Sequence, residues 1–267
     1  MKGYEFCKRS LGLLFPYGPC SICGQDSRSG PAPGICRSCW RGRKRVEHPA
    51  CPVCGFPFPQ IEGQTSHVCG ECLEDPPAFI SHVSAFAYSG PVRSLLLLYK
   101  DQRRYALATV LGRALARKAR RAWPDQAWDA VVYVPSPLRK RMVRGFEPAG
   151  LVAKAAAKWL GVPCHRHLKP RRAPRSQKGL TSAERRRNLA GAFSASKKRV
   201  EGLRVLLVDD IRTTGTTLRE AARVLARAGA EVHAATVAMT LKRDLDLVAA
   251  SKEPVGESEE LGVRSQE

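Results

Sequence analysis

The sequence predicts an α/β fold, a parallel sheet flanked by helices on both faces, joined to a small cysteine-rich domain at the N-terminal end. Strand-like and helix-like segments alternate over residues 129–240, which is typical of such a sheet. Four Cys-x2-Cys pairs precede residue 78, where periodic apolar pattern is scarce. We therefore expect a cysteine-rich domain over 1–78, an α/β domain over 79–243 and a polar, disordered tail over 244–267.

Apolar runs and their breakers place each element of the α/β domain. Pro135 and Pro137 end one strand in a loop. Gly161 stops one helix, and Gly229 closes another at the position that tolerates a left-handed backbone. In order, the expected elements are a strand and one helix over 79–125, a strand over 130–134, a helix over 147–160, a short strand over 162–168, a basic loop over 169–200, a strand over 204–208, a helix over 216–228 and a strand over 231–239.

The chain carries a large positive charge. Its 267 residues include 45 Lys and Arg against 24 Asp and Glu, a formal net charge of +21 with a pI near 10.0. Such a field attracts polyanions such as nucleic acid and diphosphates, although a soluble Arg-rich protein is the alternative. The sequence shows no secretory signal and no run of the roughly 18 apolar residues that a membrane span needs. We expect a cytoplasmic protein without membrane insertion.

The eight cysteines of the four pairs form a two-fold internal repeat. The pairs of the first set are separated by twelve residues and those of the second by fourteen, so the sets recur after 31 to 33 residues. Because thiols stay reduced in the cytoplasm, this spacing favours metal ligands over disulfides. The two sets are Cys20, Cys23, Cys36 and Cys39, and then Cys51, Cys54, Cys69 and Cys72.

Each set suits one structural zinc ion. Two residues between cysteines let both thiolates reach one ion from a tight turn, and the glycine that follows, Gly24 or Gly55, lets the backbone curl toward the sulfurs. Four thiolates complete a closed tetrahedron, which is a structural arrangement. The repeat predicts two ions, one for each set; crossed pairing and an iron–sulfur cluster are the alternatives. The other cysteines and the nearby histidines are not expected to be ligands: Cys7, Cys164, His48, His67 and His82.

The segment VLLVDDIRTTGTTL, residues 205–218, places two polar features at the end of a buried strand. Asp209 and Asp210 end the apolar run, at the carboxyl end of a parallel strand, where open α/β sheets bind ligands. The next loop presents N–H groups and hydroxyls at a helix start, which is an anion site. The aspartates can accept hydrogen bonds from ribose hydroxyls, so the segment fits both ends of a ribose 5-phosphate. The phosphate would be held by Thr213, Thr214, Gly215, Thr216 and Thr217.

Other motifs explain this segment less completely. It contains neither the G-x-x-x-x-G-K-[ST] of a P-loop nor the G-x-G-x-x-G of a dinucleotide site. Adjacent aspartates also suit a phosphatase-like metal site, but the Thr-Thr-Gly-Thr-Thr run is then unexplained. A capped helix after a buried strand accounts for one Asp or Thr and not for the whole run.

These motifs resemble those of the type I phosphoribosyltransferases and, more narrowly, of the ComF family, in which a double zinc ribbon precedes such a domain. The resemblance covers about residues 11–241 and includes PAFISHVSAFAYSGPVRSLL, VVYVPSPLRKRMVRGFEPAG and QKGLTSAERRRNLAGAF. The family pattern usually reads Arg-Gly-Phe-Asn-Gln, whereas this chain has Glu147 and Pro148 in place of the Asn-Gln pair. That departure can alter how the following helix starts, although Pro is tolerated there.

The resemblance implies a magnesium-dependent transfer of the phosphoribosyl group of phosphoribosyl diphosphate to a nitrogen nucleophile. Asp209 and Asp210 would hold the ribose hydroxyls and residues 213–217 the 5-phosphate, while magnesium bridges the diphosphate and the hydroxyls. The loop over 135–144 would meet the diphosphate through three candidate charge partners, each of which is otherwise a solvated surface side chain: Arg139, Arg141 and Arg144. A basic loop over 169–190 would close over the substrate, with weaker candidates in Lys169, Arg172 and Lys178.

Two classes of function stay open. The first is an enzyme whose acceptor is unknown, since the sequence places no His or Cys as an obvious general base. The second is a non-catalytic module that senses phosphoribosyl diphosphate or a nucleotide while its ribbons and basic loops engage single-stranded DNA or a competence helicase. The ComF resemblance connects the family with DNA uptake during natural transformation. Aromatics are only 7% of residues, fewer than stacking platforms favour, and the stacking candidates are Trp40, Phe56 and Phe58.

Overall fold

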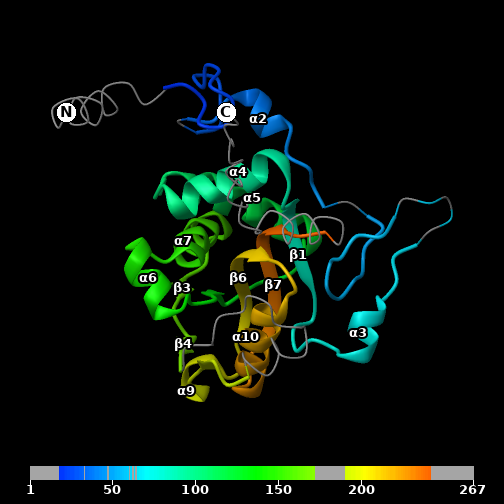
Figure 1. The fold of residues 1–267 in the computed structure, drawn as a ribbon. Helices are drawn as coiled ribbons and strands as arrows, with labels where there is room; N and C mark the ends of the chain where they lie inside the picture. Colours follow the sequence, from blue (N-terminus) through cyan, green and yellow to red (C-terminus); the bar gives the residue numbers. More distant parts are fainter. Residues whose placement is uncertain are drawn as a thin grey trace, which may run out of the picture.

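The computed structural model describes residues 18–32, 34–46, 48–59, 61, 63, 65–171 and 190–241. Its centre is a five-stranded sheet in the order β1-β7-β6-β2-β3, in which every neighbouring pair is parallel. Figure 1 shows this sheet between helices, which confirms the predicted α/β class. The strands are β1 (His82–Ala87), β2 (Ala130–Tyr133), β3 (Cys164–His165), β6 (Arg204–Arg212) and β7 (Glu231–Met239).

The middle strand, β6, is buried on both faces. Leu206 lies between Val131 of β2 and His233 of β7. Leu206 and Val208 belong to one hydrophobic cluster, whereas Val205 and Leu207 belong to the other. Because side chains alternate along a strand, a continuous apolar run is what two covered faces require.

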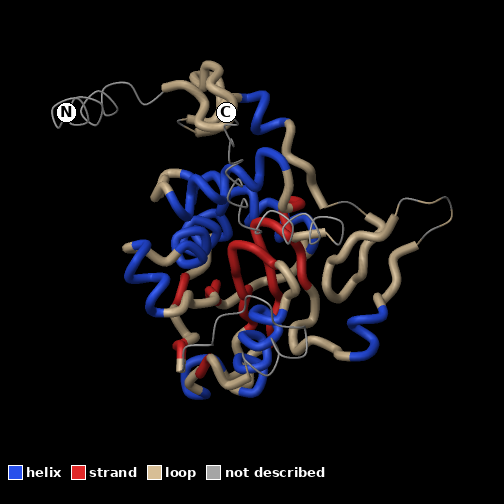
Figure 2. The backbone as a smooth tube through the Cα atoms, in the orientation of Figure 1, coloured by secondary structure: helices blue, strands red, loops and turns tan. Residues whose placement is uncertain are grey.

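Helices cover the two faces unequally, as Figure 2 also shows. The cluster that contains Leu206 is packed by helices that follow β1 and β2, and the cluster that contains Leu207 is packed by the helix that follows β6. The first group comprises α4 (Gly90–Asp101), α5 (Leu107–Ala122) and α7 (Pro148–Leu160), and the second is α10 (Thr216–Arg227). No helix in the described part of the chain is both long and apolar enough to cross a membrane.

Several elements differ from the sequence expectation. Residues 79–125 contain two helices after the strand rather than one, because the chain breaks between α4 and α5, where Arg103 adopts φ 54°. The expected loop over 135–144 contains a short helix, α6 (Leu138–Arg144), which has no buried residue and therefore no apolar periodicity to reveal it. The expected short strand over 162–168 is reduced to the two residues of β3.

The expected basic loop over 169–200 is partly ordered. β4 (Lys169–Pro170) pairs antiparallel with β5 (Phe193–Ser194), and α9 (Lys197–Val200) follows. Residues 172–189, including the candidates Arg172 and Lys178, lie outside the described residues. The proposed tail over 244–267 lies outside them as well.

The cysteine-rich segment forms two separate knuckles that pack on the α/β domain at different places. The first contains α2 (Arg37–Arg41) and inserts Ala32 and Ile35 into the cluster that α4 and α5 share. The second contains α3 (Gly70–Glu74) and packs Val53 against the cluster on the α10 side. Between them the chain runs beside the edge strand, where the Ala87 N–H donates to the Lys44 carbonyl over 2.9 Å. Figure 1 shows the first knuckle near α4 and the second beside β1.

Candidate functional site

Three neighbouring strands, β3, β2 and β6, end at one edge of the sheet because they are parallel. Each is followed by polar or cationic residues, so the sheet gathers segments that are far apart in the chain. Asp209 and Asp210 lie near the end of β6, which is longer than the expected 204–208 and reaches Arg212. Open α/β sheets bind ligands at this edge.

The two aspartates have different electrostatic surroundings. Asp210 forms an ion pair with Lys100 of α4, with 2.8 Å between Oδ1 and Nζ, and both side chains are largely buried. Burial, followed by the neighbouring Asp210 carboxylate, raises the pKa of Asp209 well above its ordinary value. The Asp209 carboxyl accepts the Asp210 backbone N–H over 2.8 Å. This hydrogen bond favours the ionised form but offsets only part of the rise in pKa. The pair therefore combines one carboxylate held in an ion pair, Asp210, with one whose ionised form is disfavoured, Asp209.

Glu147, which replaces the Asn of the family pattern, turns toward the same edge. As the N-cap of α7 it accepts the Ser136 backbone N–H at Oε1 over 2.9 Å, and its other oxygen is buried without a partner among the described residues. Its charge also contributes to raising the pKa of Asp209. Pro148 begins the helix, and its carbonyl accepts the hydroxyl of the fully buried Tyr99 over 2.8 Å. The substitution is thus accommodated without loss of the helix start.

The turn after β6 has the form of an anion site. Gly215 adopts φ 79° and caps α10, so the first N–H groups of a twelve-residue helix point out of the turn. The hydroxyls of Thr214 and Thr216 lie 2.9 Å apart and hold the turn together, and Thr213 is exposed. A Cβ at Gly215 would come within 2.8 Å of Nε of Arg212, so glycine is required by the close approach as well as by φ. Thr217 lies in the first turn of α10.

The three arginines expected near the diphosphate point in different directions. Arg141 and Pro137 line a pocket of about 540 Å³ at the carboxyl ends of β2 and β3. Arg144 instead faces Asp101, at 3.9 Å, and Arg139 is exposed on α6. The pocket also contains the weaker candidate Lys169 and two cations that the sequence reading did not select, Arg166 and Arg171.

The cysteines of each set converge. In each group of four, all Sγ atoms lie within 4.8 Å of one another. Within the sets, Sγ of Cys23 lies 3.6 Å from that of Cys36, and Sγ of Cys54 lies 3.7 Å from that of Cys69. A tetrahedron with Zn–S bonds of about 2.3 Å has edges of about 3.8 Å, whereas a disulfide bond is about 2 Å long. Both clusters therefore fit zinc ribbons.

Backbone N–H groups prepare these sulfurs for ligation. Although burial opposes the change, backbone donors lower the pKa of Cys20 to about 6 and that of Cys51 to about 7. The N–H groups of Cys54 and Cys69 lie 3.5 and 3.4 Å from Sγ of Cys51. Thiolates are the form that binds metal, so the knuckle geometry favours loading.

The second cluster is joined to the α/β domain by buried polar contacts. The carbonyl of Cys54 accepts from Nη1 of Arg212 over 3.1 Å and from Nδ1 of His82 over 2.8 Å. Gly55 permits this contact, because a Cβ there would come within 2.5 Å of the His82 carbonyl. Burial, followed by the Arg212 charge, lowers the pKa of His82 to about 3, so this histidine is neutral and has a polar role rather than a ligand role.

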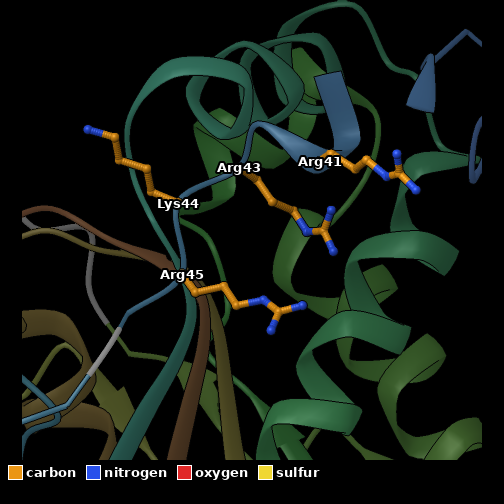
Figure 3. Close-up of a pocket in the computed structure, with 4 residues that line it drawn as sticks. All are labelled: Arg41, Arg43, Lys44 and Arg45. Atoms are coloured by element: carbon orange, nitrogen blue, oxygen red, sulfur yellow. The ribbon is translucent and has the colours of Figure 1, made fainter. Parts of the chain in front are cut away.

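Beside the first cluster, cations surround a pocket of about 390 Å³ lined by Arg41, Arg43, Lys44 and Arg45. Figure 3 shows Arg43 and Arg45 extending to the same side while Lys44 extends away, as alternation along an extended segment requires. The Arg43 guanidinium lies over the Trp40 ring at 4.0 Å, and its Nε is buried without a partner among the described residues. Burial, then the charges of Arg45 and Arg117, lower the pKa of Arg43. This group of like charges is typical of an anion site.

Sequence reasoning missed residues that act on the site from other elements. Tyr99 and Lys100 lie in the last turn of α4, and Arg212 ends β6 with only 5% of its surface exposed. The apolar residues around them predict a helix and a strand, but they do not predict which way these three side chains point. A lysine or arginine within an otherwise buried run is the one signal that could have marked them.

Comparisons with known proteins agree with this architecture. A phosphoribosyl transferase domain model matches residues 143–253, and a double zinc ribbon domain model matches residues 10–73. These matches confirm the type I phosphoribosyltransferase fold and the N-terminal zinc ribbons that the sequence resemblance implied. Among solved structures, an adenine phosphoribosyltransferase has 20% identity and a TM-score of 0.36, over 57% of this chain and 78% of that one.

Two curated relatives are similar over most of their length. The DNA utilization protein YhgH of Salmonella typhi is 38% identical over 202 residues, which cover 74% of this chain and 86% of the relative. Competence protein F of Haemophilus influenzae is 31% identical over 204 residues, with the same shares of the two chains. With these relatives, the two matched domains and the two convergent cysteine clusters, the chain belongs to the ComF family.

Proposed function

We propose that the chain binds phosphoribosyl diphosphate together with Mg²⁺ at the carboxyl edge of the sheet. One observation carries this proposal: Asp209 and Asp210 follow the apolar run of β6, close before a glycine-capped turn at the start of α10. Carboxylates on one side and helix N–H groups on the other match the hydroxyls and the 5-phosphate of one sugar. The fold and the family of the chain support the same ligand.

Each part of the ligand has a matching group. The aspartates accept from the ribose hydroxyls, and the turn over 213–217 holds the 5-phosphate. Arg141 and Lys169 line the cationic pocket at the ends of β2 and β3, where the diphosphate would extend. Magnesium, when bound, neutralises diphosphate charge while keeping part of its water shell. Lys100 pairs with Asp210 and compensates its charge at this edge.

Replacing both carboxylates by amides tests this site. We expect Asp209→Asn with Asp210→Asn to weaken phosphoribosyl diphosphate binding at least about 100-fold, because hydrogen bonds to charged groups contribute about 1.5–3 kcal/mol each. Calorimetric titration with Mg²⁺ measures the affinity. Asp129→Asn, an exposed aspartate paired with Arg204 at the opposite end of β6, is the matched control. Equal affinity in the double variant and the wild type would refute the assignment.

The same samples distinguish an enzyme from a sensor. Diphosphate release in the presence of pooled bases and amines identifies a transferase. Binding without release identifies a non-catalytic module.

The raised pKa of Asp209 predicts that this proposed binding residue lowers the stability of the folded protein. Because its folded-state pKa is raised, the ionised side chain destabilises the fold increasingly as pH rises above the unfolded value of about 3.9. We expect Asp209→Asn to raise the free energy of unfolding at pH 7 by about 0.5–2 kcal/mol. The gain should shrink as the pH falls toward 4. Urea unfolding of variant and wild type at each pH measures it, and a less stable variant at pH 7 would contradict it.

We also propose that each cysteine cluster holds one structural zinc ion. The cysteines supply four thiolates and leave no open position, so the metal would contribute folding energy and not catalysis. Metal analysis of freshly purified, reduced protein should give about two zinc ions per chain. A Cys23→Ser variant should lower the content by about one ion. Iron in place of zinc, or no metal, would disprove the prediction.

A second function is favoured by the pocket beside the first cluster: contact with the phosphates of single-stranded DNA. Burial, followed by the charges of Arg45 and Arg121, lowers the pKa of Lys118, so α5 adds to the cations that surround Arg43. No ion pair is found for the four pocket-lining residues within the described parts of the chain. The relatives named for DNA utilization and competence support a nucleic-acid ligand.

The salt dependence of DNA binding tests this pocket. We expect Arg45→Gln with Arg117→Gln to weaken binding of a single-stranded oligonucleotide and to reduce the slope of log affinity against log salt by about 1.4, since each phosphate contact contributes about 0.7. Arg199→Gln with Arg227→Gln removes equal charge from exposed positions on α9 and α10 and should leave the slope unchanged. Fluorescence anisotropy across salt concentrations measures both. Equal slopes in the two double variants would show that net charge alone drives binding.

A further inference from the structure

Two arginines of the phosphate-binding segment contact the second cysteine cluster. Arg212, the last residue of β6, donates from Nη1 to the Cys54 carbonyl over 3.1 Å. Arg219, in the second turn of α10, donates from Nη2 toward Sγ of Cys72 over 3.6 Å and from Nη1 to the Asp75 carbonyl. The two contacts thus start from opposite ends of the turn and end on segments that carry cysteines of one cluster.

The same arginines are structural parts of the turn. The Arg212 guanidinium lies against Gly215, where a Cβ would come within 2.8 Å of its Nε. The backbone of Arg212 is fixed by Thr240, whose N–H donates to its carbonyl over 2.9 Å. The Arg219 N–H donates to the Gly215 carbonyl over 2.9 Å. The Arg212 guanidinium therefore packs on the turn itself, whereas Arg219 is joined to the turn through the backbone of α10.

The geometry of the cluster gives these contacts a dependence on metal. A closed tetrahedron of four cysteines around one Zn²⁺ would fix the Cys54 and Cys72 segments relative to each other. Arg212 and Arg219 contact these two segments, at the Cys54 carbonyl and at Sγ of Cys72. With the metal lost, the Cys54 and Cys72 segments lose this constraint, and both arginine contacts lose their fixed partners. The first cluster has its own contacts, with α4 and β1.

We propose that Arg212 is a positioning residue for the phosphate-binding turn and that, with Arg219, it couples the second cysteine cluster to that turn. A loaded cluster holds both guanidinium groups in place, and these hold the turn in the geometry that binds a phosphate. This inference rests on the proposed phosphoribosyl site. Because coupling between two sites is reciprocal in binding free energy, a phosphate ester bound at the turn must tighten the affinity of the second cluster for zinc, and we expect this to appear as slower zinc release.

Zinc release from the full-length, zinc-loaded protein tests the coupling. A chromogenic chelator follows release with and without saturating ribose 5-phosphate, and a Cys23→Ser variant identifies the phase that belongs to the first cluster. We expect the ester to slow the second-cluster phase about 5- to 10-fold, within the usual range of coupling between sites, and to leave the first-cluster phase unchanged. Equal rates with and without bound ester in the wild type would overturn the proposal.

Variants of the arginine separate positioning from general stability. Arg212→Met should weaken ribose 5-phosphate binding about 5- to 10-fold and abolish the effect of the ester on zinc release, while Arg212→Lys should restore part of both by retaining the charge. Arg204→Met, at the other end of β6, is the matched control and should behave as the wild type. Ester binding by Arg212→Met with wild-type affinity would overturn the proposal. Failure of the wild type to bind the ester, measured by calorimetry, would overturn the phosphoribosyl site as well.

Discussion

The buried position of β6 is the constraint on which the rest of the structure depends. A strand covered on both faces favours apolar side chains, because a buried polar group needs a compensating partner. In this chain the apolar run of β6 ends at Val208, and Asp209 and Asp210 follow within the same strand. Two carboxylates, a glycine-capped turn and a helix start therefore follow one another within a few residues. Parallel pairing with β2 brings the segment after Pro135 to the same edge.

Charge is distributed unequally along that edge. Lys100 neutralises Asp210, while Asp209 and the partly unsatisfied Glu147 remain as neighbouring acidic groups. Carboxylates that repel one another are costly in a folded protein, and such costs concentrate at binding sites. Beyond β2 and β3 the sign reverses, and Arg141 and Lys169 face a common pocket. A ligand that presents hydroxyls to the aspartates and a diphosphate to the cationic pocket matches this gradient.

The two cysteine clusters are attached to the α/β domain in different ways. The first inserts Ile35 among the side chains of α4 and α5, so its attachment is apolar. The second is attached through hydrogen bonds to a neutral His82 and to Arg212, close to the turn that follows β6. Its placement beside α10 makes it part of the layer that covers the sheet. The duplicated motif thus has two structural environments.

The sequence by itself determined the alternation of strands and helices, the two cysteine sets and the segment 205–218, because each depends on local spacing, burial period or turn chemistry. It did not reveal α6, which has no buried face, or the division of 79–125 into two helices. Only the tertiary structure decided that Lys100 faces Asp210, that Arg141 and Arg144 diverge, and that Arg212 contacts Cys54. These contacts join residues far apart in the chain, and their geometry is set by helix packing and parallel register, which local sequence does not encode.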